Sequence, residues 1–321
     1  MTSLQTPPKP TETVAHPTPV VGAAGAAAST GMMRPKARGP GGVSRTQALL
    51  AYTLLTVGSL VFLVPFYFVV NGSLKTDAEV QAGDFITPPQ SLDDVQWQNY
   101  PRALAPDRMN FFPALANTVV ITTLSMIGQV ISCSLVGYGF ARFRFRGRSL
   151  LFMVMLSTMM LPAQVTMIPV FVLFRMLGMI DTFWPLVIPM WLASPFFVFM
   201  FRQFFAQIPE ELVEAARIDG ANNWTIYWRL MMPLCGPVIA IVSIYTFLAA
   251  WNDFLAPLIY LNSPGNRTLT LALNAFRGQF GNSDAHLMMA AAVVCMLPCV
   301  VLFFAAQRYF VESVATSGLK T

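Results

Sequence analysis

The chain has 321 residues, of which 55% are hydrophobic and only 11% are charged. Globular domains carry roughly 25% charged residues, so this composition excludes an ordinary water-exposed surface, and it is too apolar for a disordered chain. The remaining class is a membrane-embedded protein. Because lipid cannot satisfy backbone N–H and C=O groups, each crossing must be helical, which predicts an all-α membrane protein.

The first 45 residues differ in kind from the rest. Residues 1–45 are rich in proline, alanine, glycine and threonine, lack aromatic residues and have no helical period. We expect a disordered cytoplasmic tail that is a poor signal peptide.

The remainder, residues 46–321, is predicted to form one six-helix transmembrane domain. About 20 apolar residues suffice to cross the hydrocarbon layer. The third and fourth stretches contain several prolines and are expected to line a cavity. The six predicted spans are 48–70, 115–140, 149–171, 183–201, 237–260 and 287–306.

The connecting segments predict the orientation. Of the 20 lysines and arginines, 14 fall in the two termini and the alternate connections on the same side, and six fall on the other side. The positive-inside rule therefore predicts a multi-pass protein of the cell membrane with both termini in the cytoplasm. The densest cluster follows the second span, where anionic lipid head groups are better partners than nucleic acid: Arg142, Arg144, Arg146 and Arg148.

The cytoplasmic connection 202–236 has the pattern of two short helices. Pro209 suits a first helical position, Gly220 ends the first helix, and Asn222 or Asn223 can cap a second one that Pro233 ends. Small alanines and the aromatic residues Trp224 and Tyr227 are typical of a surface that binds a partner. An amphipathic helix pair on the bilayer is the other interpretation, and periodicity does not decide between them.

The same connection resembles the EAA loop of ABC-importer permease subunits. The loop requires Glu-Ala-Ala, a glycine after three residues and an aliphatic-x-aliphatic-Pro after nine more, and the spacing holds from Glu214 to Pro233. Further stretches between residues 48 and 320 resemble the carbohydrate branch, specifically the maltose-permease-like inner subunits. They are Trp97–Tyr100, Arg142–Gly147, Pro162–Val165, Trp251–Leu258, Gln307–Val311 and Gly318–Lys320.

This resemblance implies a fold, a function and partners. The fold would be the type I ABC-importer permease, and the chain would form half of a carbohydrate pathway in a heterodimer with a second permease subunit. A cytoplasmic ABC ATPase dimer would hold ATP-Mg, and an extracytoplasmic sugar-binding protein would deliver the substrate. The residues implied in ATPase coupling are Glu214, Ala215, Ala216, Asp219, Gly220 and Pro233.

The chain itself is not expected to be an enzyme. It has no Gly-x-x-x-x-Gly-Lys-Ser/Thr loop to hold a nucleotide, and we expect no catalytic residues, no cofactor and no metal site on it. Cys295 and Cys299 lie one turn apart without a histidine or acid and suit packing. A stand-alone secondary transporter driven by an ion gradient is the alternative, but it predicts buried ionisable residues, and the spans offer only Asp253.

Four residues in the spans are candidates for a substrate pathway. Asp253 is the only acid in a predicted span, Trp251 and Asn252 adjoin it, and Gln164 lies near Pro162 in the third span. Amide and carboxylate groups could bind sugar hydroxyls, and an aromatic face could stack on a sugar ring. For each residue a structural role in helix packing is an equally simple explanation.

Overall fold

The computed structural model describes residues 45–276 and 284–318, and within them every regular element is a helix. The predicted tail lies outside these residues except for Arg45, where α1 (Arg45–Ser73) begins. The chain divides into two compact units, Met1–Val57 and Gly58–Thr321. Of the first unit only the initial part of α1 is described, and the following paragraphs concern the second.

The length and hydropathy of the helices confirm an all-helical membrane protein with four to six candidate crossings in residues 45–276 and 284–318. Four stretches are long and apolar enough to cross a membrane alone, and two bent helix pairs bring the number to six if each pair counts as one crossing. The four are α1, α4 (Phe111–Arg142), the α7–α8 stretch Trp184–Gln207, and Ala285–Gln307 of α15 (Ala285–Gly318). The two pairs are Arg148–Met160 with Ala163–Met176, bent by 98°, and Asn223–Leu234 with Gly236–Trp251, bent by 78°.

The bend in the first pair lies at Leu161 and Pro162, inside the predicted span 149–171. α5 (Arg148–Ser157) and a 3₁₀ turn, η1 (Thr158–Met160), precede it, and α6 (Ala163–Met176) follows. Leu161 is extended, with ψ 119°, because the ring of a following proline disfavours the helical conformation. This stretch is therefore two helix segments rather than one kinked helix.

The predicted span 237–260 is also interrupted. α12 (Gly236–Trp251) ends at Asn252, and α13 (Leu255–Tyr260) begins after Phe254. The Asp253 side chain accepts a hydrogen bond from the backbone N–H of Ala256 at 3.2 Å and so caps the new helix. A short polar side chain that bonds to nearby backbone competes with continuation of the preceding helix.

The other elements are short. They connect the long helices or form parts of the bent stretches. They are α2 (Asp77–Gln81), α3 (Asn99–Leu104), α7 (Trp184–Val187), η2 (Ile188–Trp191), α8 (Pro195–Gln207), α9 (Glu210–Ile218), α10 (Asn223–Thr225), η3 (Ile226–Met231), α11 (Met232–Leu234), η4 (Pro264–Asn266), α14 (Leu269–Leu273) and η5 (Asn274–Phe276).

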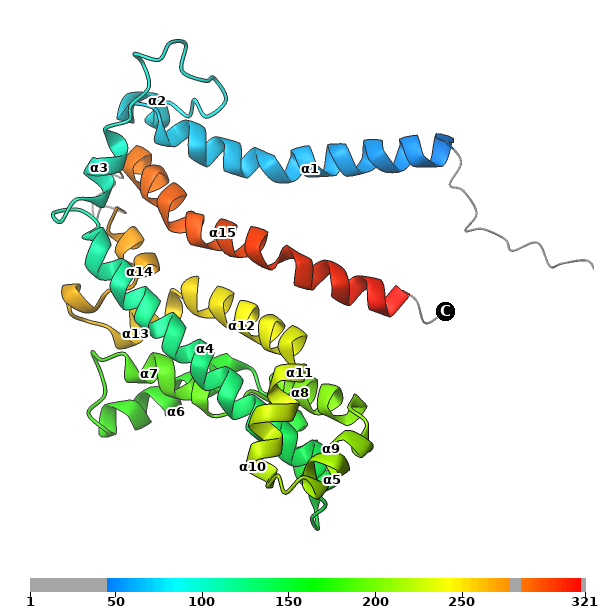
Figure 1. The fold of residues 1–321 in the computed structure, drawn as a ribbon. Coiled ribbons are helices and arrows are strands. Elements are labelled where there is room, and N and C mark those ends of the chain that lie inside the picture. The colour runs from blue at the N-terminus through cyan, green and yellow to red at the C-terminus, as the bar shows by residue number, and fades with distance from the viewer. Residues whose placement is uncertain (1–44, 277–283, 319–321) are drawn as a thin grey trace, which may run out of the picture. The chain divides into compact units, whose positions relative to one another are not determined.

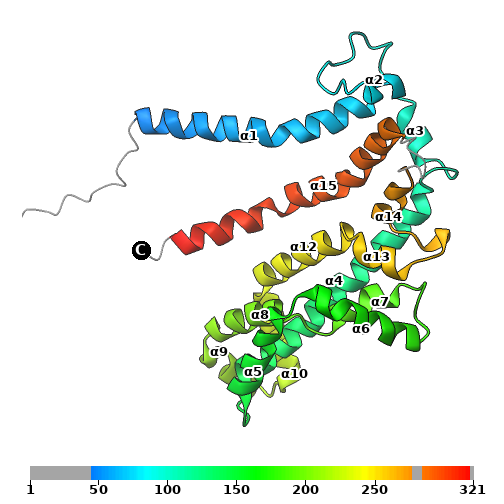
Figure 2. The same cartoon turned by 180° about the vertical axis from the view of Figure 1, so that it is seen from behind.

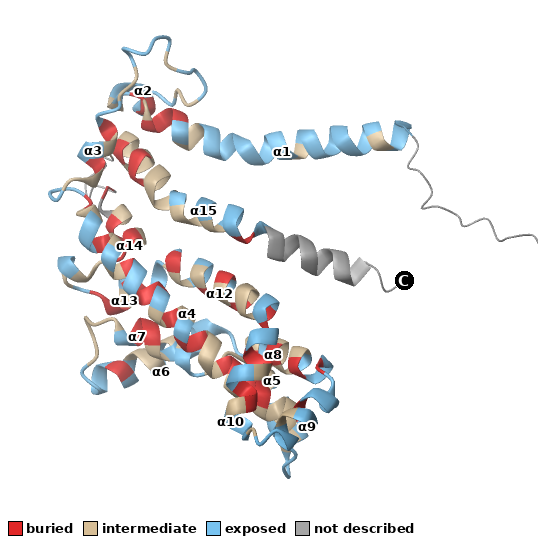
Figure 3. Cartoon of the chain, in the orientation of Figure 1, coloured by how far each residue is buried: buried red, intermediate tan, exposed pale blue. Residues whose placement is uncertain are grey.

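Helix α4 is the centre of the second unit and lies alongside α8 and α12 (Figures 1 and 2). Its buried residues recur along its whole length, whereas α5 has none (Figure 3). α4 packs closely on α8 at Gly137, where an added Cβ would lie 2.7 Å from Cβ of Phe201. Because glycine has no side chain, α8 can pack closely against α4 at this position.

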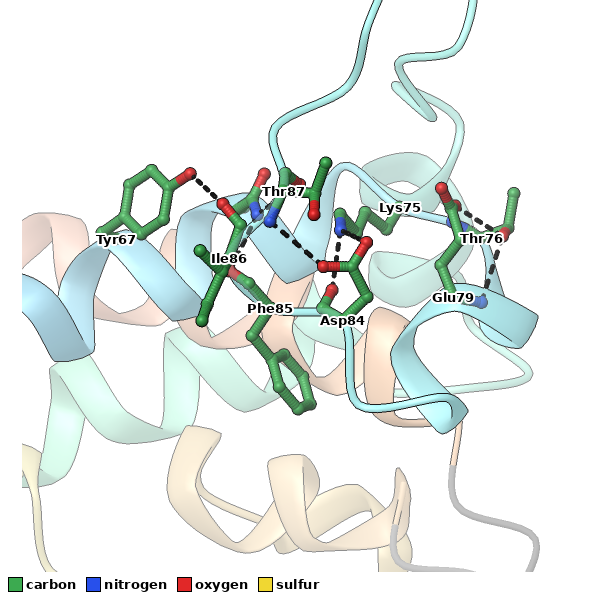
Figure 4. Close-up of polar contacts among 9 residues, drawn as sticks. Tyr67, Lys75, Thr76, Glu79, Asp84, Phe85, Ile86 and Thr87 are labelled. Atoms are coloured by element: carbon green, nitrogen blue, oxygen red, sulfur yellow. Dashed lines mark hydrogen bonds and ion pairs between the residues drawn. The ribbon is translucent and has the colours of Figure 1, made fainter.

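The segment between α1 and α4 is ordered by buried polar contacts (Figure 4). Lys75 is 2% exposed, and its ammonium lies 2.7 Å from a carboxylate oxygen of Asp84. It also donates to the Asp84 backbone carbonyl, while Asn99 Nδ2 donates to the carbonyls of Ser73 and Lys75. These bonds tie the end of α1 to the chain that leads into α4.

We expect the Asp84→Asn variant to unfold at a temperature lower by roughly 1–3 °C near neutral pH. The hydrogen bonds from Lys75 and from the Thr87 backbone lower the Asp84 pKa to about 2. A lowered pKa stabilises the fold above the ordinary value near 3.8, and this contribution is lost as pH falls toward about 2. The difference between wild type and variant should therefore stay constant from pH 8 to 5 and shrink below pH 4, as followed by thermal unfolding.

Asp93→Asn is the matched control, because Asp93 is exposed in the same segment and Lys75 bonds to Asp84 instead. It should have little effect on the unfolding temperature at any of these pH values. An equal loss in both variants would show that only the segment's total charge matters, and would contradict the role of the Lys75–Asp84 pair.

Candidate coupling surface and transport pathway

The connection 202–236 contains the predicted helix, glycine corner and second helix. α9 begins at Glu210, so Pro209 lies at the flanking position rather than at the predicted first helical one. Val213 anchors α9 with 2% exposure. Gly220 has φ +83°, and the N–H of Ala221 bonds to the carbonyl of Ala216 at 2.9 Å. The predicted end of the helix at Gly220 is confirmed, since a left-handed residue after the last turn is a common helix stop.

The second helix starts and ends close to the predicted residues. The Asn222 side chain accepts the N–H of Thr225 at 2.8 Å and caps α10. A π-helical turn, η3, follows, and α11 contains Pro233 as one of its first residues. The helical stretch Asn223–Leu234 ends one residue after Pro233, so the predicted end agrees to within one residue.

Tyr227 is buried in its own chain rather than presented to a partner. It is 1% exposed, and its hydroxyl lies 2.6 Å from Oγ of Ser134 on α4. Its neighbour Trp224 stacks on it and stays 60% exposed. Only one of the two aromatic residues predicted as partner contacts is thus available at the surface.

We define the coupling segment as residues 209–233. Many of its residues are exposed. Five of the six residues implied in coupling are exposed, and Ala216 is half-buried against the core. Large apolar side chains lie exposed between them, although the segment is outside the predicted spans. The exposed apolar residues and the exposed residues implied in coupling are Leu212, Glu214, Ala215, Ile218, Asp219, Gly220, Trp224, Trp228 and Pro233.

Arg142 does not join the other arginines of the predicted lipid-facing cluster. Its Nη2 donates to the backbone carbonyls of Phe205 and Ile208 at 2.7 and 2.6 Å. Arg144 and Arg146 are exposed. Sequence reasoning missed these inward bonds, because a run of alternating arginines carries no signal that distinguishes one from the next.

Two of the four pathway candidates lie in one cavity. Gln164 and Asp253 both line a cavity of about 370 Å³ between α6, the α7–η2 stretch and α13. Most of the wall is apolar, with Met167, Met190 and Tyr260 among the lining residues. This combination of an apolar wall and a few polar groups is typical of small-molecule sites.

The other two candidates have structural contacts outside this cavity. Trp251 is 5% exposed, stacks on Phe247 and donates its Nε1–H to the carbonyl of Cys295 on α15. The Asn252 amide donates to the carbonyl of Leu248 in its own helix. The structure therefore brings Gln164 and Asp253 together and leaves Trp251 and Asn252 apart from them.

Sites for other chemistry were sought in the same residues. Within 45–276 and 284–318, no group of three or more His, Cys, Asp or Glu side chains could hold a metal ion. Cys295 and Cys299 are free thiols that pack against a core cluster of α12, α14 and α15.

Comparison with known proteins identifies relatives over most of the chain. Residues 133–316 match the family described as binding-protein-dependent transport system inner membrane component. The arabinooligosaccharides transport system permease protein AraQ of Bacillus subtilis strain 168 is 31% identical over 266 residues, 82% of this chain and 92% of its own length. The melibiose/raffinose/stachyose import permease protein MelC of the same organism is 32% identical over 283 residues, 86% of this chain and 99% of its own.

A solved structure has the same fold. It is a crystal structure of a bacterial ABC transporter involved in the import of the acidic polysaccharide alginate, and one of its chains matches with a TM-score of 0.73 and 25% identity. The match covers 83% of this chain and 97% of that chain.

The candidate membrane-spanning helices and the shared fold define a multi-pass membrane protein of the ABC-importer permease class. The chain belongs to the family of binding-protein-dependent transport system inner membrane components. The resemblance to carbohydrate ABC-importer permease subunits is thereby confirmed, and the family is one of transport subunits rather than of catalytic enzymes.

Proposed function

We propose that the chain is one of two permease subunits of an ATP-driven carbohydrate importer and forms half of its translocation pathway. Family membership supports a transport function. The relatives AraQ and MelC are named for arabinooligosaccharides and for melibiose, raffinose and stachyose, which supports an oligosaccharide as substrate.

The coupling segment contacts a cytoplasmic ATPase dimer. ATP-Mg binds to that dimer and not to this chain. The observation that carries this assignment is the segment's exposed apolar surface: Ile218 is 87% exposed and Leu212 47%. Such side chains favour burial in a partner groove, and alanine allows close approach. Glu214 and Asp219 supply the polar contacts at its rim.

The remaining partners follow from the same assignment. A second permease completes the pathway, and an extracytoplasmic binding protein delivers the sugar. With the coupling segment inside the cell, both termini are cytoplasmic, and Arg144 and Arg146 lie near anionic lipid head groups.

The sugar path passes the cavity between α6 and α13. Its amide and carboxylate, from Gln164 and Asp253, can bind hydroxyl groups, and its apolar wall suits the C–H faces of a sugar ring. Trp251 and Asn252 do not line this cavity, so we assign them packing roles.

We expect Glu214→Ala to lower sugar uptake and substrate-stimulated ATPase activity about tenfold, as for loss of one charged contact with the ATPase. Glu214 is exposed, so the two permeases should still assemble with the ATPase. The measurement is uptake into liposomes with the purified complex, with co-purification as the control for assembly. Normal uptake by the variant, or ATP-independent uptake by this chain alone, would contradict the proposal; the second result would support a secondary transporter.

A further inference from the structure

The inner end of α4 contacts the chain on both sides of coupling helix α9. On the near side, the guanidinium of Arg142 bonds to the carbonyls of Phe205 and Ile208, at the end of α8 and directly before Pro209. The last carbonyls of a helix lack partners within it and carry partial negative charge, so a cation is well placed there. Arg142 therefore holds the root of α9.

On the far side, α4 contacts the helix that follows the glycine corner. Ser134 shares its hydrogen bond with Tyr227 of η3, and the Tyr138 hydroxyl donates to the carbonyl of Asn223 at 3.5 Å. The Tyr138 ring lies between those of Phe205 and Tyr227, at centroid distances of 5.8 and 5.3 Å. Both arms of the coupling segment thus rest on one stretch of α4.

The opposite part of α4 reaches the region of the cavity. The Trp191 indole N–H donates to the carbonyl of Leu124 at 3.1 Å, and Trp191 directly follows the cavity-lining Met190. Farther along, the Asn117 amide donates to the carbonyls of Gly265 and Arg267. One continuous helix, Phe111–Arg142, therefore connects the coupling segment with the wall of the cavity.

We infer that Arg142 is a positioning residue that clamps the root of coupling helix α9 to α4, so that displacement of the coupling segment moves α4 and the cavity wall with it. This inference rests on the proposed function of the coupling segment. A clamp of two hydrogen bonds to a guanidinium is directional and charge-assisted, so it resists separation more than apolar contacts alone. Without these two hydrogen bonds, α9 can be displaced while α4 keeps its position.

The test uses the complete importer in liposomes and compares Arg142→Ala with Arg142→Lys and Arg144→Ala. In Arg142→Ala, the sugar imported per ATP hydrolysed should fall about tenfold, because ATPase activity persists while the push no longer reaches the pathway. Arg142→Lys retains a cationic donor and should restore part of this ratio. Arg144→Ala removes the same charge from an exposed side chain in the same connection and should match the wild type.

Amide hydrogen exchange provides a second measurement on the same complexes. The backbone around residues 205–218 should exchange faster in Arg142→Ala, while α12 keeps its wild-type exchange. Unchanged exchange together with an unchanged sugar-to-ATP ratio would overturn the inference. So would a parallel loss of uptake and ATPase activity that lysine does not restore, since it would indicate a purely structural role.

These outcomes are separate from those that test the proposed function. If Glu214→Ala loses uptake while Arg142→Ala keeps its sugar-to-ATP ratio, only the clamp is wrong. If Glu214→Ala transports normally, the coupling segment itself has been misassigned.

Discussion

Replacement of Gly220 by valine is expected to reduce transport about tenfold while the membrane-embedded helices stay folded. Gly220 has φ +83°, which costs roughly 1–2 kcal/mol for an L-residue and more for a β-branched one. A Cβ at this position would meet no heavy atom within 4 Å, so the strain is in the backbone alone. The chain relieves it by leaving the left-handed conformation, which redirects α9 relative to α10 and removes the shape that we propose the ATPase binds.

Gly220→Asn is the matched control, because asparagine tolerates positive φ better than other non-glycine residues. Uptake should then be close to that of the wild type, measured in liposomes at equal amounts of assembled complex. Equal loss in the valine and asparagine variants would contradict the conformational argument, since it would mean that any side chain at the corner blocks the partner.

The features of this protein that depend on local sequence could be predicted. Apolar runs longer than a bilayer crossing predict the helices whatever their neighbours are. The same holds for the corner: Gly220 follows the end of an amphipathic helix, and Asn222 has a backbone N–H within reach three residues later. The helix end at Gly220 and the cap at Asn222 depend only on residues within about two helical turns along the chain.

Features that depend on distant parts of the chain could not be predicted. The sequence predicts Tyr227 as a surface aromatic residue. In the fold its hydroxyl bonds to Ser134, which lies 93 positions earlier in the chain. Asp181, with φ 63°, accepts the N–H groups of Asn262 and Ser263, and hydrogen bonds from Ser263 hold the pKa of its carboxyl well below its usual range. Nothing near Asp181 in the sequence indicates these bonds, because turn contacts between distant loops have no sequence period.

The four candidate pathway residues depend partly on local sequence and partly on distant parts of the chain. Asp253 is conspicuous in the sequence as an acid among apolar residues. Its hydrogen bond to the start of α13 is local and joins residues three apart. Its place in the same cavity as Gln164 depends on the tertiary fold. Trp251 and Asn252 adjoin Asp253 in the chain, but the helix directs Trp251 toward α15 instead. Neighbours in a helical sequence point in different directions, so adjacency was a poor guide to shared function.

A single added methyl group at Gly137 should destabilise the protein measurably. The Cβ of Gly137→Ala would lie 2.7 Å from Cβ of Phe201 and 3.2 Å from both the amide N of Arg202 and the carbonyl oxygen of Val198. These atoms belong to the α8 backbone or are attached directly to it, so no side-chain rotation can make room. Overpacking of this kind costs about 1–3 kcal/mol, and we expect the thermal unfolding midpoint of the complex to fall by several degrees.

Gly139→Ala is the control for this variant in the same helix. A Cβ at Gly139 meets nothing within 4 Å, and alanine is favoured over glycine inside a helix by about 0.5–1 kcal/mol, so its unfolding midpoint should be equal to or above that of the wild type. Since Gly137 lies between Ser134 and Arg142, moving α4 away from α8 should also lengthen the Arg142 bonds and lower the sugar-to-ATP ratio in the folded fraction. If both alanine variants were equally stable, the close approach of α4 and α8 would not be what holds the coupling segment against α4.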